Sequence, residues 1–169
     1  MVEQRKPEWL KVIVQSNQGK IKVERLLETL ALSTVCQEAS CPNLMECYSR
    51  KTATFLILGP VCTRHCTFCN IQKGRPEPLA SDEPVRVAQA VAALELKHAV
   101  VTSVTRDDLP DGGAEQFAEV IAAIKAINPD TTVEVLVPDF QGDLRALATV
   151  VAAGPAVLNH NVETVPRLY

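Results

Sequence analysis

The chain has 169 residues, of which 47% are hydrophobic and 22% are charged, and its formal net charge is −3. This length suits about one ordinary domain with a real core, and it falls short of a closed eight-unit (β/α) barrel, which takes about 250 residues. The composition excludes a disordered chain, the charge provides no basic field for nucleic acid, and no apolar run approaches the roughly 20 residues of a membrane helix. We therefore expect a globular, cytoplasmic protein with no nucleic-acid partner and no membrane partner.

The N-terminal 52 residues hold three of the six cysteines. A polar arm carries Trp9, which we expect to dock against the body, and apolar residues at helical spacing predict a packed helix over 22–32. Cys36, Cys41 and Cys47 follow, with a spacing that is not that of a zinc finger. Three thiolates within so short a reach suit an iron–sulfur cluster whose fourth ligand comes from elsewhere. A structural zinc or a set of buried free thiols is the alternative.

The other three cysteines, Cys62, Cys66 and Cys69, lie on one loop directly after an apolar run at 55–58 that reads as a buried strand. One short loop with this spacing can fold its sulfurs around a compact inorganic centre, and thiolates are the usual ligands of iron–sulfur clusters. A [4Fe–4S] cluster held by three thiolates has one iron without a protein ligand, which is free to bind a substrate or cofactor. This indicates a catalytic cluster. The alternative is a zinc knuckle that recruits His65, which we interpret instead as a solvated loop residue.

Strands and helices alternate through the rest of the chain. Apolar runs predict a buried parallel strand at 99–104 and further strands at 132–137 and 156–159, and helical spacing predicts helices at 82–96, 117–124 and 144–151. Such repeats with right-handed crossovers form a parallel sheet or a barrel. We therefore expect residues 53–169 to form the first four units of a partial (β/α) barrel of the TIM type, after a cluster-binding extension over residues 1–52.

Two polar loops are predicted to meet at the carboxyl edge of this sheet, where α/β folds bind their ligands. The first covers 105–113, after the second predicted strand of the repeat, and a helix-capping turn is its alternative interpretation. The second covers 159–163, after the fourth predicted strand. We interpret His160, in this second loop, as a packed or orienting residue rather than a base.

The spacing of Cys62, Cys66 and Cys69, with an aromatic residue just before the last of them, resembles the cluster loop of radical S-adenosylmethionine (SAM) enzymes. In that superfamily the open iron is chelated by the amino and carboxylate groups of the methionine part of SAM, and one electron cleaves SAM to a 5'-deoxyadenosyl radical. The earlier cysteine set resembles the auxiliary-cluster motif of the lipoyl synthase family. The resemblance to this family covers nearly every residue of the chain.

The resemblance implies an enzyme that inserts two sulfur atoms, at carbons 6 and 8, into a protein-bound octanoyl chain to form the lipoyl cofactor. It implies two [4Fe–4S] clusters, one making the radical from SAM at Cys62, Cys66 and Cys69, and one giving up sulfur. It also implies octanoylated carrier domains as partners, either 2-oxoacid dehydrogenase E2 or the glycine cleavage H protein, and a ferredoxin- or flavodoxin-type electron donor.

By the same analogy, several residues of the cluster loop and of the two rim loops would contact SAM. Asn159 and Glu163 would meet its carboxylate and its ribose hydroxyls, because an amide donor suits the first and a carboxylate acceptor suits the second. The full set of expected cofactor-binding residues is Phe68, Thr105, Asp107, Gly112, Gly113, Asn159 and Glu163.

The chain stops at Tyr169, whereas lipoyl synthases continue to a six-stranded partial barrel and to a C-terminal serine that ligates the auxiliary cluster. We expect the strand at 156–159 to be left as an apolar edge, so that residues 1–169 alone are poorly soluble or oligomeric. Two alternatives stay open for the function. One is a sulfur-inserting enzyme like biotin synthase, against which the first cysteine set argues. The other is a two-cluster electron carrier like a ferredoxin, which is shorter and has four-cysteine runs.

Overall fold

The computed structural model describes residues 18–168, so Trp9 and the rest of the N-terminal arm lie outside the described range. A five-stranded sheet with the strand order β1-β2-β5-β6-β7 forms the centre of the fold. Its strands are β1 (Ser33–Thr34), β2 (Thr54–Ile57), β5 (His98–Ser103), β6 (Thr132–Leu136) and β7 (Val157–Asn159). The last four are parallel to their neighbours, whereas β1 pairs with β2 in the antiparallel direction.

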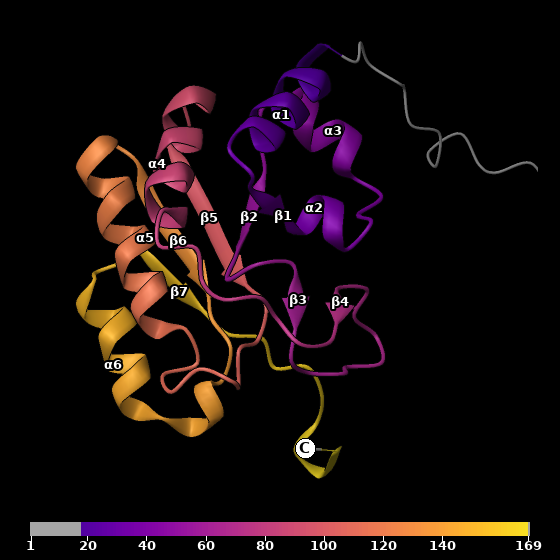
Figure 1. Cartoon of the computed structure of the whole chain (residues 1–169), viewed down its shortest axis with the longest axis vertical. Helices are drawn as coiled ribbons and strands as arrows, with labels where there is room; N and C mark the ends of the chain where they lie inside the picture. The colour runs from indigo at the N-terminus through magenta and orange to yellow at the C-terminus, as the bar shows by residue number, and fades with distance from the viewer. Residues whose placement is uncertain (1–17, 169) are drawn as a thin grey trace, which may run out of the picture.

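Three helices cover one face of this sheet (Figure 1), namely α4 (Glu83–Leu94), α5 (Ala114–Ile127) and α6 (Leu144–Ala152). Alternate residues of a strand point to opposite faces, and Val133 and Val135 of β6 are fully buried while Glu134 between them is not. The expected alternation of strands and helices is therefore confirmed as an α/β fold with a mostly parallel sheet.

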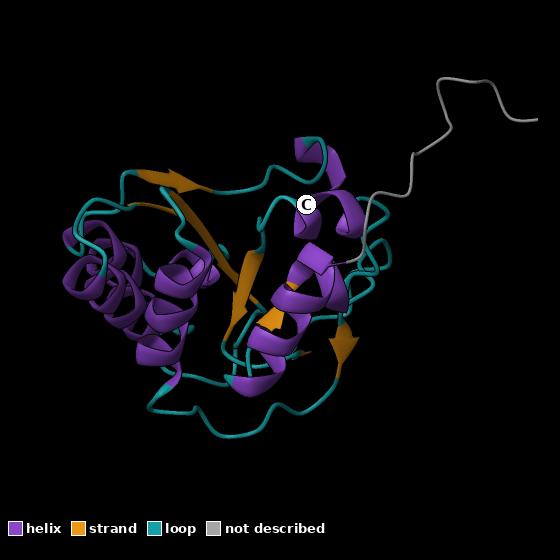
Figure 2. Ribbon diagram, turned by 90° about the horizontal axis from the view of Figure 1, so that it is seen from above, coloured by secondary structure: helices purple, strands orange, loops and turns teal. Residues whose placement is uncertain are grey.

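The N-terminal extension gathers three helices at the β1–β2 end of the sheet (Figure 1): α1 (Gln18–Thr29), α2 (Val35–Glu38) and α3 (Leu44–Ser49). Figure 2 shows the strands lying between these helices and the α4–α6 layer. Arg86 of α4 ties the two parts together, because its Nη1 donates to the backbone carbonyls of Leu30 and Ala31, each at 2.6 Å.

The helix predicted over 22–32 starts and ends earlier than expected. It is closed by a Schellman motif, in which the Leu32 N–H donates to the Leu27 carbonyl and the Ala31 N–H donates to the Glu28 carbonyl. Ala31 takes the left-handed conformation that this motif requires, with φ 47. The chain therefore turns at Ala31 to enter β1.

The remaining elements are small. A two-stranded parallel sheet joins β3 (Val61–Cys62) to β4 (Gln72–Lys73), and two short 3₁₀ helices are η2 (Phe140–Gly142) and η3 (Pro166–Leu168). Cys62, expected on a loop, thus lies at the end of a short strand. Within residues 18–168, no helix is both long and apolar enough to cross a membrane.

Candidate cluster and cofactor site

The loop that carries Cys62, Cys66 and Cys69 is docked against the carboxyl end of β5. Both the backbone N–H and the hydroxyl of Thr63 donate to the Thr105 carbonyl, at 3.0 and 2.9 Å. The backbone N–H of Asp107 donates in return to the Thr63 hydroxyl, at 3.1 Å. These bonds place the cysteines at the edge of the sheet where ligands of α/β folds bind.

The three thiols of this loop fit an iron–sulfur cluster in their chemistry and their exposure. Cys66 is exposed, and Cys62 and Cys69 are half-buried, so a cluster can reach all three. The sulfur of Cys62 accepts two backbone hydrogen bonds, from the N–H groups of Arg64 and Thr105, each at 3.4 Å. Such N–H···S bonds stabilise a thiolate, and around bound clusters they are among the groups that set the reduction potential.

Arg64 joins the cysteine loop to the loops after β5 and β6. Its Nε and Nη2 donate to the two carboxylate oxygens of Asp107, at 2.7 and 2.9 Å. Its Nη1 and Nη2 donate to those of Asp139, at 2.9 and 2.7 Å. The guanidinium lowers the pKa of the Asp107 carboxyl and holds that of Asp139 at about 2, while the two carboxylates raise the pKa of Arg64.

A cleft of about 390 Å³ lies beside this loop. It brings Cys66 and Phe68 of the cysteine loop together with residues from the carboxyl ends of β5, β6 and β7. The residues that line it are Arg64, Cys66, Phe68, Thr102, Ser103, Thr105, Leu136, Val137, Pro138, Asp139, His160, Asn161 and Glu163. Phe68 is 70% exposed, so an aromatic surface is available to a ligand in the cleft.

His160 is held in one orientation at this cleft. Its Nδ1 lies 2.9 Å from the carbonyl oxygen of Val137, and a carbonyl only accepts, so Nδ1 carries the proton in the neutral ring. This bond orients the imidazole, and the role of His160 as a packed or orienting residue stays a prediction.

The structure places the expected cofactor residues in different surroundings. Phe68, Thr105 and Glu163 line the cleft. Asn159 does not, because its Nδ2 donates to Oε1 of Glu134, at 2.6 Å. The amide of this segment that does line the cleft is Asn161, which the sequence did not single out.

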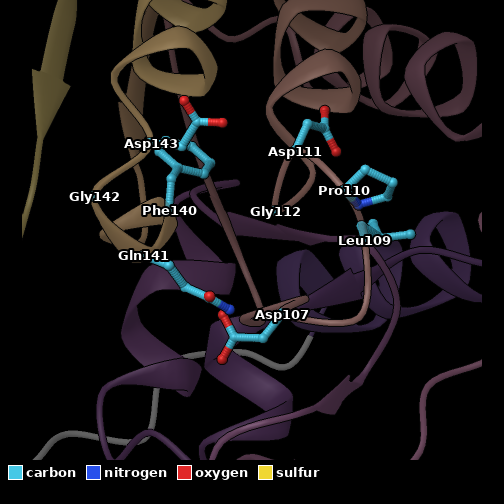
Figure 3. A pocket seen from close by; sticks show the side chains of 9 residues that line it. All are labelled: Asp107, Leu109, Pro110, Asp111, Gly112, Phe140, Gln141, Gly142 and Asp143. Atoms are coloured by element: carbon cyan, nitrogen blue, oxygen red, sulfur yellow. The ribbon is translucent and has the colours of Figure 1, made fainter.

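A second pocket, of about 450 Å³, lies between the loops after β5 and β6 (Figure 3). Figure 3 shows Asp111 and Asp143 at its rim, with Asp107 beside Gln141. Asp111 accepts the backbone N–H groups of Gly113 and Glu115 at the start of α5, and Asp143 accepts that of Arg145 at the start of α6. The carboxylates at the rim are therefore occupied as helix caps.

Gly113 has a packing reason to be glycine. Its φ is 90, in the left-handed region, and a Cβ there would lie 2.4 Å from a methyl carbon of Leu58. Together with the Asp111 cap, this makes 111–113 a helix-capping turn, which was the alternative interpretation of the segment. Contacts from Gly112 and Gly113 to a cofactor stay predictions.

The first cysteine set lies on two short helices of the N-terminal extension and the turn between them, with Cys36 in α2, Cys47 in α3 and Cys41 in the turn. Cys36 in α2 is buried, while Cys41 and Cys47 are half-buried. Burial raises the pKa of the Cys47 thiol, and charge on Cys36 and Cys41 raises it further. The hydroxyl of Tyr48, 2.6 Å from that of Thr34, holds α3 against β1.

Neither set is arranged around one ion. Within residues 18–168, no group of three or more histidine, cysteine or acidic side chains could hold a single metal ion. In a [4Fe–4S] cluster, each thiolate ligates a different iron, so the sulfur atoms stand farther apart than around one ion.

Comparison with known proteins identifies the superfamily. Residues 56–169 match the model of the radical SAM superfamily, which is more than half of the chain, and the chain belongs to that superfamily. Membership implies a [4Fe–4S] cluster and SAM.

The relatives name the family more narrowly. The chain is 60% identical over 169 residues to a lipoyl synthase of Caldicellulosiruptor saccharolyticus, covering 100% of this chain and 59% of the relative. It is 59% identical over 165 residues to that of Caldanaerobacter subterraneus subsp. tengcongensis, with coverages of 98% and 57%. For Chloroflexus aurantiacus the identity is 56% over 165 residues, with coverages of 98% and 54%. The resemblance to lipoyl synthases is thus confirmed, and the chain spans somewhat more than half the length of these relatives.

Proposed function

We propose that this chain is the N-terminal part of a lipoyl synthase, which inserts two sulfur atoms, at carbons 6 and 8, into a protein-bound octanoyl chain. The observation that carries the proposal is the single cleft that joins Cys66 and Phe68 of the cysteine loop to the carboxyl ends of three parallel strands. Superfamily membership and the lipoyl synthase relatives support it. In this proposal the cluster-binding extension ends at residue 52, and the first units of the barrel follow from residue 53.

Cys62, Cys66 and Cys69 would hold the radical [4Fe–4S] cluster. With SAM bound, this cluster supplies a 5'-deoxyadenosyl radical that removes hydrogen atoms from unactivated carbons, which acid–base side chains cannot do. The protein contributes the position of the cysteines, through the bonds from Thr63 to Thr105, and the two N–H donors at the Cys62 sulfur.

The cleft is the proposed SAM site. Phe68 would pack against the cofactor, and the backbone of Thr105 and the carboxylate of Glu163 would meet its polar groups. Asn161, rather than Asn159, would supply the amide donor to the SAM carboxylate, because the Asn159 amide is bonded to Glu134. Asp107 would act through Arg64, which it binds.

Cys36, Cys41 and Cys47 would hold a second [4Fe–4S] cluster, consumed as the sulfur donor. The proposed substrate is an octanoyl-lysine on a lipoyl carrier domain, of a 2-oxoacid dehydrogenase E2 or a glycine cleavage H protein. A ferredoxin or flavodoxin would supply the electrons, and the reaction would take place in the cytoplasm.

Anaerobic reconstitution with iron and sulfide, followed by incubation with SAM and dithionite, tests the first half of the proposal. A radical SAM enzyme forms 5'-deoxyadenosine, whereas a two-cluster electron carrier forms none. The second half is tested on the intact enzyme with an octanoyl-lysine peptide, since mass spectrometry of the peptide detects two added sulfur atoms. A product with no sulfur, despite SAM cleavage, would contradict the lipoyl synthase assignment.

A further inference from the structure

The two hydrogen bonds at the Cys62 sulfur come from different segments of the chain. One donor is the backbone N–H of Arg64, in the cysteine loop itself, and the other is that of Thr105, 43 residues away in the loop after β5. The Thr105 donor stays at the sulfur only while these two segments remain docked.

The Arg64 side chain spans the same two segments. Its bidentate bond to Asp107 holds the loop after β5 at a position two residues beyond Thr105. Its bonds to Asp139 hold the guanidinium from the loop after β6. The side chain is 31% exposed, so these bonds are partly shielded from water. A planar guanidinium with two carboxylate partners is a far stiffer link than a lysine ammonium would be.

We propose that Arg64 is a positioning residue that raises the reduction potential of the cluster bound by Cys62, Cys66 and Cys69. It does so by keeping the N–H groups of Arg64 and Thr105 on the Cys62 sulfur. This inference rests on the proposed function of that cysteine loop. A hydrogen bond to a ligand sulfur stabilises the more negative, reduced form of a cluster, so losing it lowers the potential.

The test must separate two effects of Arg64 on the reduction potential, namely the effect of its charge and the effect of the hydrogen-bond geometry that it maintains. Arg64 and its two aspartates carry one positive and two negative charges, so Arg64→Ala adds one net negative charge beside the cluster, and this alone lowers the potential. The double variant Arg64→Gln/Asp107→Asn leaves only Asp139 charged, so the net charge of the group stays at −1 while the bidentate link is lost. It therefore reports the geometry alone.

The measurement is a redox titration of the reconstituted protein with dithionite, in which one electron enters the cluster and the reduced form is followed by electron paramagnetic resonance. A Cys41→Ala/Cys47→Ala background removes the second cluster and leaves the buried Cys36 in place. Iron content is expected to stay at about four per chain. The double variant should lower the equilibrium constant of one-electron reduction by about tenfold, which corresponds to about 59 mV, and Arg64→Ala should lower it further because it also adds a negative charge.

Two further variants complete the set. Arg64→Lys should fall between the parent protein and Arg64→Ala, because it restores the charge without the bidentate bond. Arg145→Ala, which alters a side chain that is 95% exposed, should keep the parent potential.

The outcomes are distinct. A double variant with the parent potential would overturn the inference, since charge alone would then explain Arg64→Ala, and an unchanged Arg64→Ala would overturn it as well. Loss of iron from every Arg64 variant would also contradict it, because Arg64 would then be needed for assembly. A parent protein that binds no cluster at these cysteines would overturn the proposed function, and the inference with it.

Discussion

The three cysteines of the loop after β2 have different surroundings, and this decides which of them best reports cluster binding. The Cys62 sulfur accepts two backbone hydrogen bonds, and Cys69 is half-buried. Cys66 is exposed and lines the cleft. Replacing an exposed side chain usually changes the free energy of unfolding by less than about 0.5 kcal/mol, so Cys66 can be altered without harm to the fold.

We predict that Cys66→Ala removes about four irons per chain and abolishes formation of 5'-deoxyadenosine, because one cluster ligand is lost. Cys41→Ala, its matched counterpart in the N-terminal extension, should keep SAM cleavage and stop sulfur insertion by the intact enzyme. Iron analysis and chromatography of the SAM products check both variants. SAM cleavage retained in Cys66→Ala would refute the assignment of this loop.

Asp139 makes the stability of the folded protein depend on pH in the acidic range. Its folded-state pKa of about 2 lies below the ordinary value of about 3.9 for an aspartate, so its stabilising contribution is complete above about pH 4 and is lost as the pH falls toward 2. The side chain is 49% exposed, which limits the contribution to about 1 kcal/mol or less.

We predict that the free energy of unfolding falls less steeply between pH 4 and pH 2 in Asp139→Asn than in the parent protein, because the variant has no carboxyl group to protonate at this position. Urea titrations at several pH values measure this. Asp130→Asn, in an exposed turn, is the control and should follow the parent curve. Equal slopes for Asp139→Asn and the parent would contradict the prediction.

At the scale of elements, the long and periodic segments were predictable and the short ones were not. The strands β2, β5 and β6 and the helices α4, α5 and α6 follow directly from apolar runs and helical spacing, since each has a face buried in the core. The edge strand β7 was also predicted from its apolar run, although all three of its residues are exposed. In contrast, β1, α2, α3, β3 and β4 have two to six residues each, too few to show a period. Contacts distant in sequence, such as Thr34 to Tyr48, stabilise them instead.

In the candidate site, too, features that are local in sequence were predictable and contacts between distant residues were not. Cysteine spacing identified both candidate cluster motifs, because ligands on one loop are local in sequence. The partners of Arg64 are 43 and 75 residues away, and no local pattern connects them. The bond from Asn159 to Glu134 joins neighbouring strands and was missed for the same reason.

We predict that Gly113→Ala destabilises the start of α5 by about 1–3 kcal/mol, because it combines a left-handed backbone with a clash against Leu58. Gly142→Ala is the matched control. Its φ of 79 is also in the left-handed region, but nothing lies within 4 Å of its added Cβ, so only the backbone cost remains. Urea unfolding of the two variants should show the larger loss for Gly113→Ala, and an equal loss would exclude the packing contribution.

At the scale of the whole molecule, the two edges of the sheet differ in the described residues, because one is the two-residue strand β1 and the other is the apolar strand β7. The β1 strand pairs with β2 at one side, whereas β7 lies at the other. Val157 and Leu158 of β7 are 40% and 36% exposed, and Val151 of α6 is 57% exposed. A bare edge with apolar side chains favours pairing with another chain.

We therefore predict that residues 1–169 alone associate or are poorly soluble, and that Val157→Lys/Leu158→Lys reduces the association by placing charge on the edge. Size-exclusion chromatography of both proteins under anaerobic conditions measures this. A parent chain that elutes as a stable monomer would show that its four parallel strands form a self-sufficient domain.

The antiparallel strand β1 also limits how the sheet can close into a barrel. A cylinder of strands closes only when its first strand pairs with its last, and Ser33 and Thr34 already pair with Leu56 and Phe55 on the outer side of β2. On this side of the sheet a closing strand could therefore pair only with β1, which offers two residues for the ladder.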